Sequence, residues 1–156
     1  MALRPHQRFR QRAFLAFSRF SRGMTLGVRA VLLKERHVVL VKHTYLSGWY
    51  LPGGGVEAGE SFGEALAREI SEEAGAVLTG PAELFAIYRN AHADPRDHVA
   101  HFVCRSWEQD GTLRLPNHEI LASELFPLDA LPPGTTEATK ARLREVIGGE
   151  TPSLDW

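Results

Sequence analysis

Residues 54–76 read GGVEAGESFGEALAREISEEAGA, and this stretch contains a helix whose two ends are marked in the sequence. Ser61 is followed three residues later by Glu64, which is the pairing of a capping box at a helix N-terminus. Gly75 stands where a left-handed residue commonly ends a helix. The sequence therefore predicts a helix over residues 62–74.

The carboxylates of this predicted helix do not all face solvent. At about 100° per residue, its apolar stripe consists of Phe62, Leu66 and Ile70. Measured from the first of these, Glu73 falls at about 20° and Glu69 at about −20°, within the range of the stripe, and Glu72 at about −80°. Charged side chains ordinarily occupy the solvated face of a helix, so two glutamates turned toward the core require an explanation.

A divalent cation is the explanation that the spacing favours. Glu69, Glu72 and Glu73 stand at i, i+3 and i+4, so their side chains converge and repel one another. Arg68 can pair with one of them, but a single arginine cannot neutralise three carboxylates. Carboxylate oxygens are the ligands that Mg²⁺ prefers, with Mn²⁺ as a substitute, so the sequence predicts a metal site; the alternative is that one glutamate is protonated.

A glycine-rich loop, residues 53–55, directly precedes the helix. Glycine permits positive φ and a close approach of the backbone to a ligand. Any tight turn uses glycine, so the loop is informative because of its place before a helix that carries carboxylates. There it favours a loop that shapes a phosphate and metal site.

The spacing of these residues resembles the signature of the Nudix hydrolases. That signature is a glycine, five residues, a glutamate, seven residues, and then Arg-Glu-aliphatic-x-Glu-Glu-x-Gly-hydrophobic. This sequence fills every fixed position, with Gly54, Glu60, Arg68, Glu69, Ile70, Glu72, Glu73, Gly75 and Ala76. The resemblance implies an α/β fold of the mixed α+β kind, an α/β/α sandwich with a mixed central sheet.

The resemblance also implies a chemistry. Nudix hydrolases cleave a nucleoside diphosphate linked to another group, NDP-X, into NMP and phosphoryl-X by in-line attack of water, with Mg²⁺. The catalytic residues implied are Arg68, Glu69, Glu72 and Glu73. The three glutamates would bind the metal, with Glu60 as an auxiliary ligand or supporting group. Arg68 would orient Glu72 or Glu69 through a salt bridge.

The residue that takes the proton from the attacking water stays open at this point. In the family this base comes from the signature or from a later loop. Glu69 is the candidate within the signature, and the loop candidates are Asp94, Asp97 and Glu119.

Substrate contacts are expected outside the helix. Arg29 lies in the middle of an apolar run, an awkward place for a charge unless it meets a phosphate; the alternative is an arginine that faces outward. Lys42 and His43 end the next strand, and either is expected to reach the substrate. The loop contacts expected are Gly53, Gly54 and Glu119.

The rest of the chain predicts strands and one more helix. The strands expected are residues 25–33, 37–43, 84–88, 98–105 and 124–128, and the helix is residues 136–147. Hairpin-like pairs occur together with a crossover, which favours a mixed sheet covered by helices.

The charge divides the chain into parts. Residues 1–34 hold eight of the 18 basic residues and none of the 19 acidic ones, so the remainder is acidic. We expect a basic amphipathic segment over residues 1–23, one domain over residues 24–148, and a flexible tail over residues 149–156. The leading segment either packs its phenylalanines on the domain or a second subunit, or acts as a membrane-surface helix or transit peptide.

Composition excludes several classes of protein. The chain has 156 residues, 44% hydrophobic and 24% charged, which suits one folded domain. Its single cysteine, Cys104, excludes an internal disulfide and a thiolate-rich zinc site and fits a reducing, cytoplasmic compartment. We expect no transmembrane segment and no stable nucleic-acid partner, and a homodimer is the default for a small enzyme.

The substrate is not determined by the sequence. His92 occupies the position where a proline accompanies ADP-ribose cleavage in the family, so no X group is assigned. A nucleoside triphosphate pyrophosphatase and a non-catalytic nucleotide sensor remain alternatives. The basic leading segment adds an RNA-end pyrophosphatase or a membrane-surface enzyme.

Overall fold

The computed structural model describes residue 17 and residues 23–156, so most of the expected basic leading segment lies outside the described residues. The elements in chain order are β1 (Thr25–Lys34), β2 (His37–His43), α2 (Phe62–Ala74), β3 (Ala76–Leu78), β4 (Ala82–Arg89), β5 (Asp97–Cys104), β6 (Trp107–Gln109), β7 (Ile120–Pro127) and α3 (Glu137–Gly148). Among the described residues, no helix is both long and apolar enough to cross a bilayer.

The central sheet is mixed, as expected. Its five strands follow the order β4-β5-β1-β2-β7. The pair β1 and β5 is parallel, and the other neighbours are antiparallel. The turn between β1 and β2 is centred on Glu35, whose φ of 54° is left-handed. These strands confirm the predicted hairpin and the predicted crossover.

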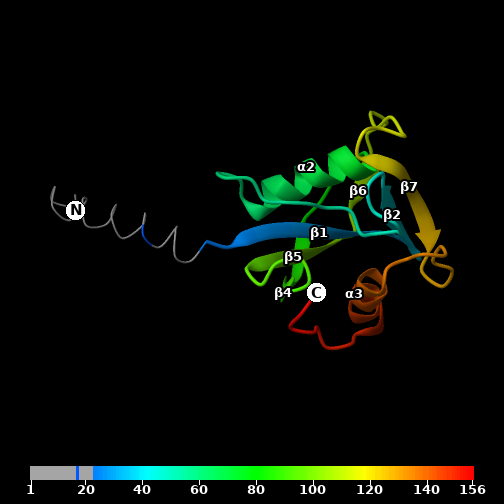
Figure 1. Ribbon diagram of the computed structural model, residues 1–156. Helices are drawn as coiled ribbons and strands as arrows, with labels where there is room; N and C mark the ends of the chain where they lie inside the picture. The colour runs from blue at the N-terminus through cyan, green and yellow to red at the C-terminus, as the bar shows by residue number, and fades with distance from the viewer. Residues whose placement is uncertain (1–16, 18–22) are drawn as a thin grey trace.

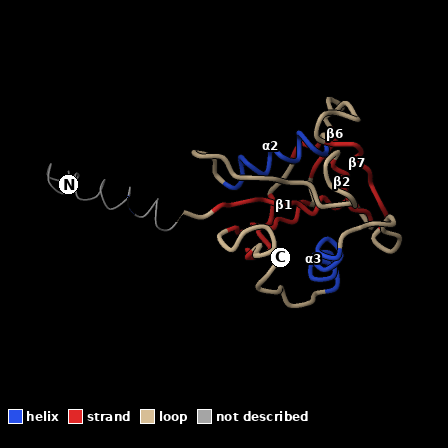
Figure 2. Tube along the Cα trace, in the orientation of Figure 1, coloured by secondary structure: helices blue, strands red, loops and turns tan. Residues whose placement is uncertain are grey.

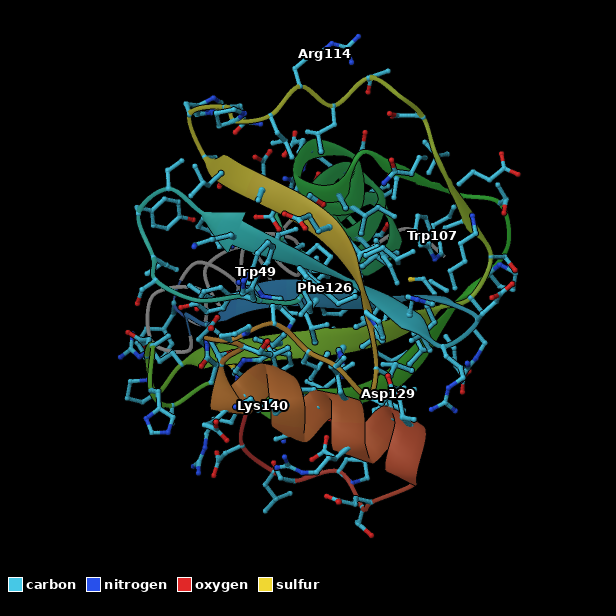
Figure 3. The ribbon with its side chains drawn as sticks, turned by 90° about the vertical axis from the view of Figure 1, so that its right-hand side faces the viewer. Trp49, Trp107, Arg114, Phe126, Asp129 and Lys140 are labelled. Atoms are coloured by element: carbon cyan, nitrogen blue, oxygen red, sulfur yellow. The ribbon has the colours of Figure 1, made fainter. Side chains whose placement is uncertain are left out.

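One helix covers each face of the sheet (Figure 1). The strands alternate in the usual way, so that Val28, Ala30 and Leu32 of β1 pack toward α2. The intervening Val31 and Leu33 join the second cluster, which contains Leu143 of α3. Figure 3 looks along the layers and shows α2 and α3 on opposite sides of the strands. The α/β/α arrangement is therefore confirmed.

The predicted ends of α2 are confirmed. Ser61 accepts a hydrogen bond from the Glu64 backbone N–H, and the Glu64 side chain accepts one from the Ser61 N–H. Gly75 adopts φ 60° and ψ 33°. The last helix is capped in a similar way by Thr136, one residue before α3 begins.

Two features of the sheets depart from the predictions. The short antiparallel pair of β3 and β6 was not expected, because three-residue strands give no alternating pattern to read. Figure 2 shows β6 near the end of α2. Strand β7 begins at Ile120 rather than at residue 124, because it pairs with the whole of β2.

The last four residues, 153–156, which we call the C-terminal strap, lie in the segment expected to be a flexible tail and form hydrogen bonds with the end of β4. The Arg89 backbone N–H donates to the Leu154 carbonyl at 3.0 Å, and the Trp156 N–H donates to the Arg89 carbonyl at 2.9 Å. The Arg89 guanidinium also binds the Asp155 carboxylate at 2.6 Å. The strap thus extends the end of β4, a tertiary pairing that local sequence does not encode.

A buried polar network joins α3 to the sheet and to the strap. Arg142 and Glu145 are 3% and 5% exposed and form an ion pair at 2.8 Å. Glu145 also accepts hydrogen bonds from the Tyr88 hydroxyl at 2.6 Å and from the Ser153 N–H at 3.0 Å. The Arg142 guanidinium lies over the Tyr88 ring, 4.2 Å from its centroid.

We expect Arg142→Met to lower the free energy of unfolding by about 3 kcal/mol, because it leaves the Glu145 carboxylate buried without a cation. Arg144→Met removes an exposed arginine from the same helix and should cost less than about 0.5 kcal/mol. Urea unfolding followed by circular dichroism measures both. An equal decrease in the free energy of unfolding in the two variants would show that the buried ion pair contributes no more to stability than an exposed arginine does.

Candidate active site

The predicted inward orientation of two glutamates of α2 is confirmed. Glu69 is 9% exposed and Glu73 is 3% exposed. Glu72, at the edge of the stripe, has 58% of its side chain exposed. The helix therefore presents two buried carboxylates and one accessible carboxylate along one side.

The glycine loop is shaped around these carboxylates. A Cβ on Gly54 would lie 2.6 Å from Glu69 Oε1, so any larger residue there would displace the Glu69 carboxylate. Gly53 adopts φ 139° and lies directly on β1, where a Cβ would meet the Val28 carbonyl oxygen at 2.1 Å. Its N–H donates to Glu73 Oε2 at 2.8 Å. The two buried glutamates thus hold the glycine loop against α2.

Arg68 organises the accessible side of the cluster. Its Nε and Nη2 donate to the two oxygens of Glu60, at 2.9 and 3.0 Å. Its Nη1 donates to Glu69 Oε1 at 2.6 Å and to Glu72 Oε2 at 3.4 Å. The expected salt bridge from Arg68 is therefore present to both glutamates.

Glu60 is expected to be an auxiliary metal ligand or a supporting group, and its contacts in the structure are of the supporting kind. Both of its oxygens bind Arg68, and Oε2 also accepts a hydrogen bond from the Glu57 N–H at 2.9 Å. These bonds hold the pKa of Glu60 at about 2. The structure thus gives Glu60 a supporting contact with Arg68 in place of a free ligand atom.

The buried carboxylates bind protons unusually tightly. Burial raises the pKa of Glu73 to about 7, although the Gly53 N–H and the Arg29 charge oppose that shift. Burial also raises the pKa of Glu69, while its contact with Arg68 lowers it. These shifts reflect the cost of placing a negative charge here without a compensating cation.

His43 and Glu119 complete a set of donors around Glu73. One ligand atom from each of the three side chains lies within 4.8 Å of the others. His43 Nδ1 is 3.7 Å from Glu73 Oε1, and burial lowers the pKa of this imidazole. Buried carboxylate oxygens beside a buried nitrogen that lacks a hydrogen-bond partner fit a divalent cation.

Only one of the three loop carboxylates reaches this cluster. Glu119 lies with Glu73 and His43. Asp97, the first residue of β5, instead accepts hydrogen bonds from the Thr25 hydroxyl and the Asn90 side chain, each at 2.8 Å, and lines the cleft that contains Gly54 and Arg29. Asp94 accepts the Arg96 N–H at 2.7 Å within an exposed turn.

Arg29 faces inward beneath the glycine loop. Its guanidinium donates to the carbonyls of Leu51 and Gly53. The side chain borders two adjoining clefts of about 240 and 360 Å³, which also share Asn90 and Trp156. The alternative of an outward-facing arginine is therefore wrong, and the Arg29 side chain is accessible from both clefts.

Lys42 does not join the carboxylates. Successive residues of a strand point to opposite faces, and His43 takes the face of β2 toward α2. The Lys42 ammonium lies 5.9 Å from the centroid of the Trp49 ring, on the other face. Trp49 packs edge-on against Phe126 with ring centroids 4.8 Å apart (both labelled in Figure 3), so it belongs to the core.

Two residues of the clefts, Asn90 and Trp156, were not predicted from the sequence. Trp156 stands at the boundary of both clefts because the strap pairs with β4, and Asn90 follows β4 directly. No local pattern marks either position. The edge-on contacts of the Trp156 ring with Tyr88 and His101, both with centroids 5.5 Å apart, hold it in place.

The model of the NUDIX domain family matches residues 23–146. The chain belongs to the Nudix hydrolase family. The match covers every strand, α2 and most of α3, so the resemblance extends well beyond the one helix and one loop that first indicated it.

Individual Nudix proteins are similar to this chain at moderate identity. An ADP-ribose pyrophosphatase of Methanocaldococcus jannaschii is 32% identical over 110 residues, which are 69% of this chain and 64% of that protein. The chain thus spans just under two thirds of that relative. A MutT Nudix hydrolase of Burkholderia pseudomallei superposes with a TM-score of 0.66 at 27% identity, covering 78% of this chain and 97% of that one. An ADP-ribose pyrophosphatase of Streptococcus suis gives 0.59 at 28% identity, with 84% and 96% coverage.

The raised pKa of Glu73 predicts how stability depends on pH in the metal-free Nudix domain. A carboxyl that binds its proton more tightly when folded makes the free energy of unfolding fall as the pH rises from about 4.5 to about 7. We expect the wild type to lose about 3 kcal/mol over this range relative to Glu73→Gln.

Urea unfolding with EDTA at about pH 5 and about pH 8 measures this difference. Glu72→Gln, an exposed change on the same helix, should follow the wild type. Parallel profiles for wild type and Glu73→Gln would contradict the assigned burial cost.

Proposed function

We propose that this protein hydrolyses the diphosphate linkage of a nucleoside diphosphate attached to another group, with Mg²⁺, releasing NMP and phosphoryl-X. The observation that carries this proposal is the pair of buried carboxylates, Glu69 and Glu73, packed against a glycine loop in which Gly54 leaves room for Glu69 and the Gly53 N–H binds Glu73. At such a site the two carboxylates would bind a cation, and the adjoining loop would bind the diphosphate that the cation neutralises.

The metal site is formed by the glutamates of α2 together with the loop carboxylate. Glu69, Glu72, Glu73 and Glu119 would hold the cation, and Mn²⁺ would substitute for Mg²⁺. When bound, the cation neutralises diphosphate oxygens and makes a water molecule more acidic. Arg68 keeps Glu69 oriented through the bond to its Oε1.

The proton of the attacking water goes to a carboxylate oxygen of this cluster. Glu69 and Glu119 are the two candidates in this cluster, since Asp97 is bonded to Thr25 and Asn90 on the wall of the cleft and Asp94 lies in an exposed turn. Water then attacks phosphorus in line with the leaving phosphate. Arg29, beneath the loop, supplies a positive charge to a substrate that crosses from the carboxylates into the clefts.

The clefts bordered by Arg29, Asn90 and Trp156 would receive the nucleoside or the X group. A half-buried indole beside a guanidinium suits a planar base and a phosphate. The names of two relatives, both ADP-ribose pyrophosphatases, support a substrate of the NDP-X class. A panel of NDP-X compounds would identify the X group that this chain prefers.

We expect turnover of at least one NDP-X compound in the presence of Mg²⁺, with a loss of at least about 10³-fold in Glu73→Gln, because the metal loses a buried ligand. The measurement is a panel of NDP-X compounds and nucleoside triphosphates, with products separated by ion-exchange chromatography. Glu83→Gln, an exposed change on β4, should retain full activity.

Three other outcomes of this panel would contradict parts of the proposed function. Hydrolysis of triphosphates alone would overturn the NDP-X assignment in favour of a triphosphate pyrophosphatase. Nucleotide binding without turnover of any compound would favour a non-catalytic sensor. Turnover in Glu73→Gln at the wild-type rate would remove the buried carboxylate from the mechanism.

We expect Trp156→Ala to raise KM about tenfold and to leave kcat within about twofold, because the ring borders the clefts and does not touch the carboxylates. Leu154→Ala is the matched control within the strap, since that side chain is 86% exposed and its backbone bond to Arg89 is retained. Steady-state kinetics on the best NDP-X compound measures both. An unchanged KM in Trp156→Ala would place the binding surface elsewhere.

A further inference from the structure

His43 carries a buried nitrogen that the fold leaves without a partner. Its side chain is 3% exposed, and Nδ1 accepts or donates no hydrogen bond within the described residues. The imidazole packs against the rings of Tyr45 and Tyr50, with centroids 5.2 and 5.6 Å away. Those ring contacts account for the packing of His43, but they leave the polar atom unsatisfied, which is costly in a protein interior.

The unpartnered nitrogen points toward a carboxylate oxygen that is fixed from its other side. Glu73 Oε2 accepts the Gly53 N–H at 2.8 Å, which leaves Oε1 directed toward His43. The distance from His43 Nδ1 to Glu73 Oε1 is 3.7 Å, too long for a good hydrogen bond. Two ligands of one first-row cation stand about 3.0–4.2 Å apart, so the gap matches a shared ion.

The third donor is held in place by the backbone of its loop. The Thr44 N–H donates to the Glu119 carbonyl at 2.9 Å, and the Thr44 hydroxyl donates to the His118 carbonyl at 2.9 Å. Asn117 accepts the N–H groups of Glu119 and Ile120, at 2.9 and 2.7 Å. The loop is thereby tied to the end of β2, one residue beyond His43.

We propose that His43 is a nitrogen ligand of the catalytic cation, together with Glu73 and Glu119. The proposal rests on the function proposed above, because it concerns the same metal site. An imidazole ligand shifts the preference of a site toward Mn²⁺ and later first-row cations, whereas Mg²⁺ prefers oxygen alone. On one side of the site, Arg68 then donates hydrogen bonds to Glu60 and Glu69. On the other side, His43 coordinates the ion.

Pulsed EPR on the full chain loaded with Mn²⁺ tests this directly. Electron spin echo modulation from a coordinated ¹⁴N should appear in the wild type and change on labelling with ¹⁵N-histidine. It should disappear in His43→Gln and persist in His118→Gln, which removes the other histidine beside Glu119. If His43→Gln does not fold, the labelled wild type shows whether a histidine binds the ion, and His118→Gln shows whether that histidine is His118.

Calorimetry gives a second readout that does not depend on turnover. Mn²⁺ should bind His43→Gln about tenfold more weakly than the wild type, while Mg²⁺ affinity changes less than about twofold. His37→Gln, at the opposite end of β2, should bind both ions as the wild type does.

The two proposals fail in different ways. Mn²⁺ binding without nitrogen modulation in the wild type would overturn the role of His43 and leave the hydrolase intact. Absence of binding of either ion, together with silence across the substrate panel, would overturn the proposed function itself. Nitrogen modulation that is lost in His118→Gln would assign the ligand to that residue and overturn the proposal for His43.

Discussion

The structure depends on the burial of two carboxylates of one helix against a glycine loop. Glu73 bonds to the Gly53 N–H, and the Glu69 carboxylate occupies the space that a side chain on Gly54 would need. Because desolvation raises the pKa of both acids, the metal-free fold carries a cost at neutral pH that a cation would offset. Stability and metal binding are therefore two aspects of the same arrangement.

The parts of this site that the sequence predicts are those encoded locally. The start and end of α2 follow from Ser61 and Gly75, and the inward turn of Glu69 and Glu73 follows from helical periodicity. The hairpin of β1 and β2 follows in the same way from two apolar runs joined by a short polar turn. Each of these signals lies within a few residues of the feature that it predicts.

What the sequence does not predict depends on contacts between distant segments. Alternation along β2 requires that Lys42 and His43 face opposite sides, but nothing local says which one faces α2. The choice of Glu119 over Asp97 depends on which loop packs against the end of β2. The place of Trp156 depends on pairing with a strand whose sequence is far away.

The C-terminal strap couples the clefts to the rest of the domain. Its backbone pairs with the end of β4, its Ser153 N–H binds the buried carboxylate of α3, and its indole borders the space beside Arg29. A molecule that packs against that indole would stabilise the paired conformation of the C-terminal strap. A strap that is already paired with β4 would in turn provide a preformed wall for the clefts. By thermodynamic reciprocity, fraying of these last residues and occupancy of the clefts oppose each other.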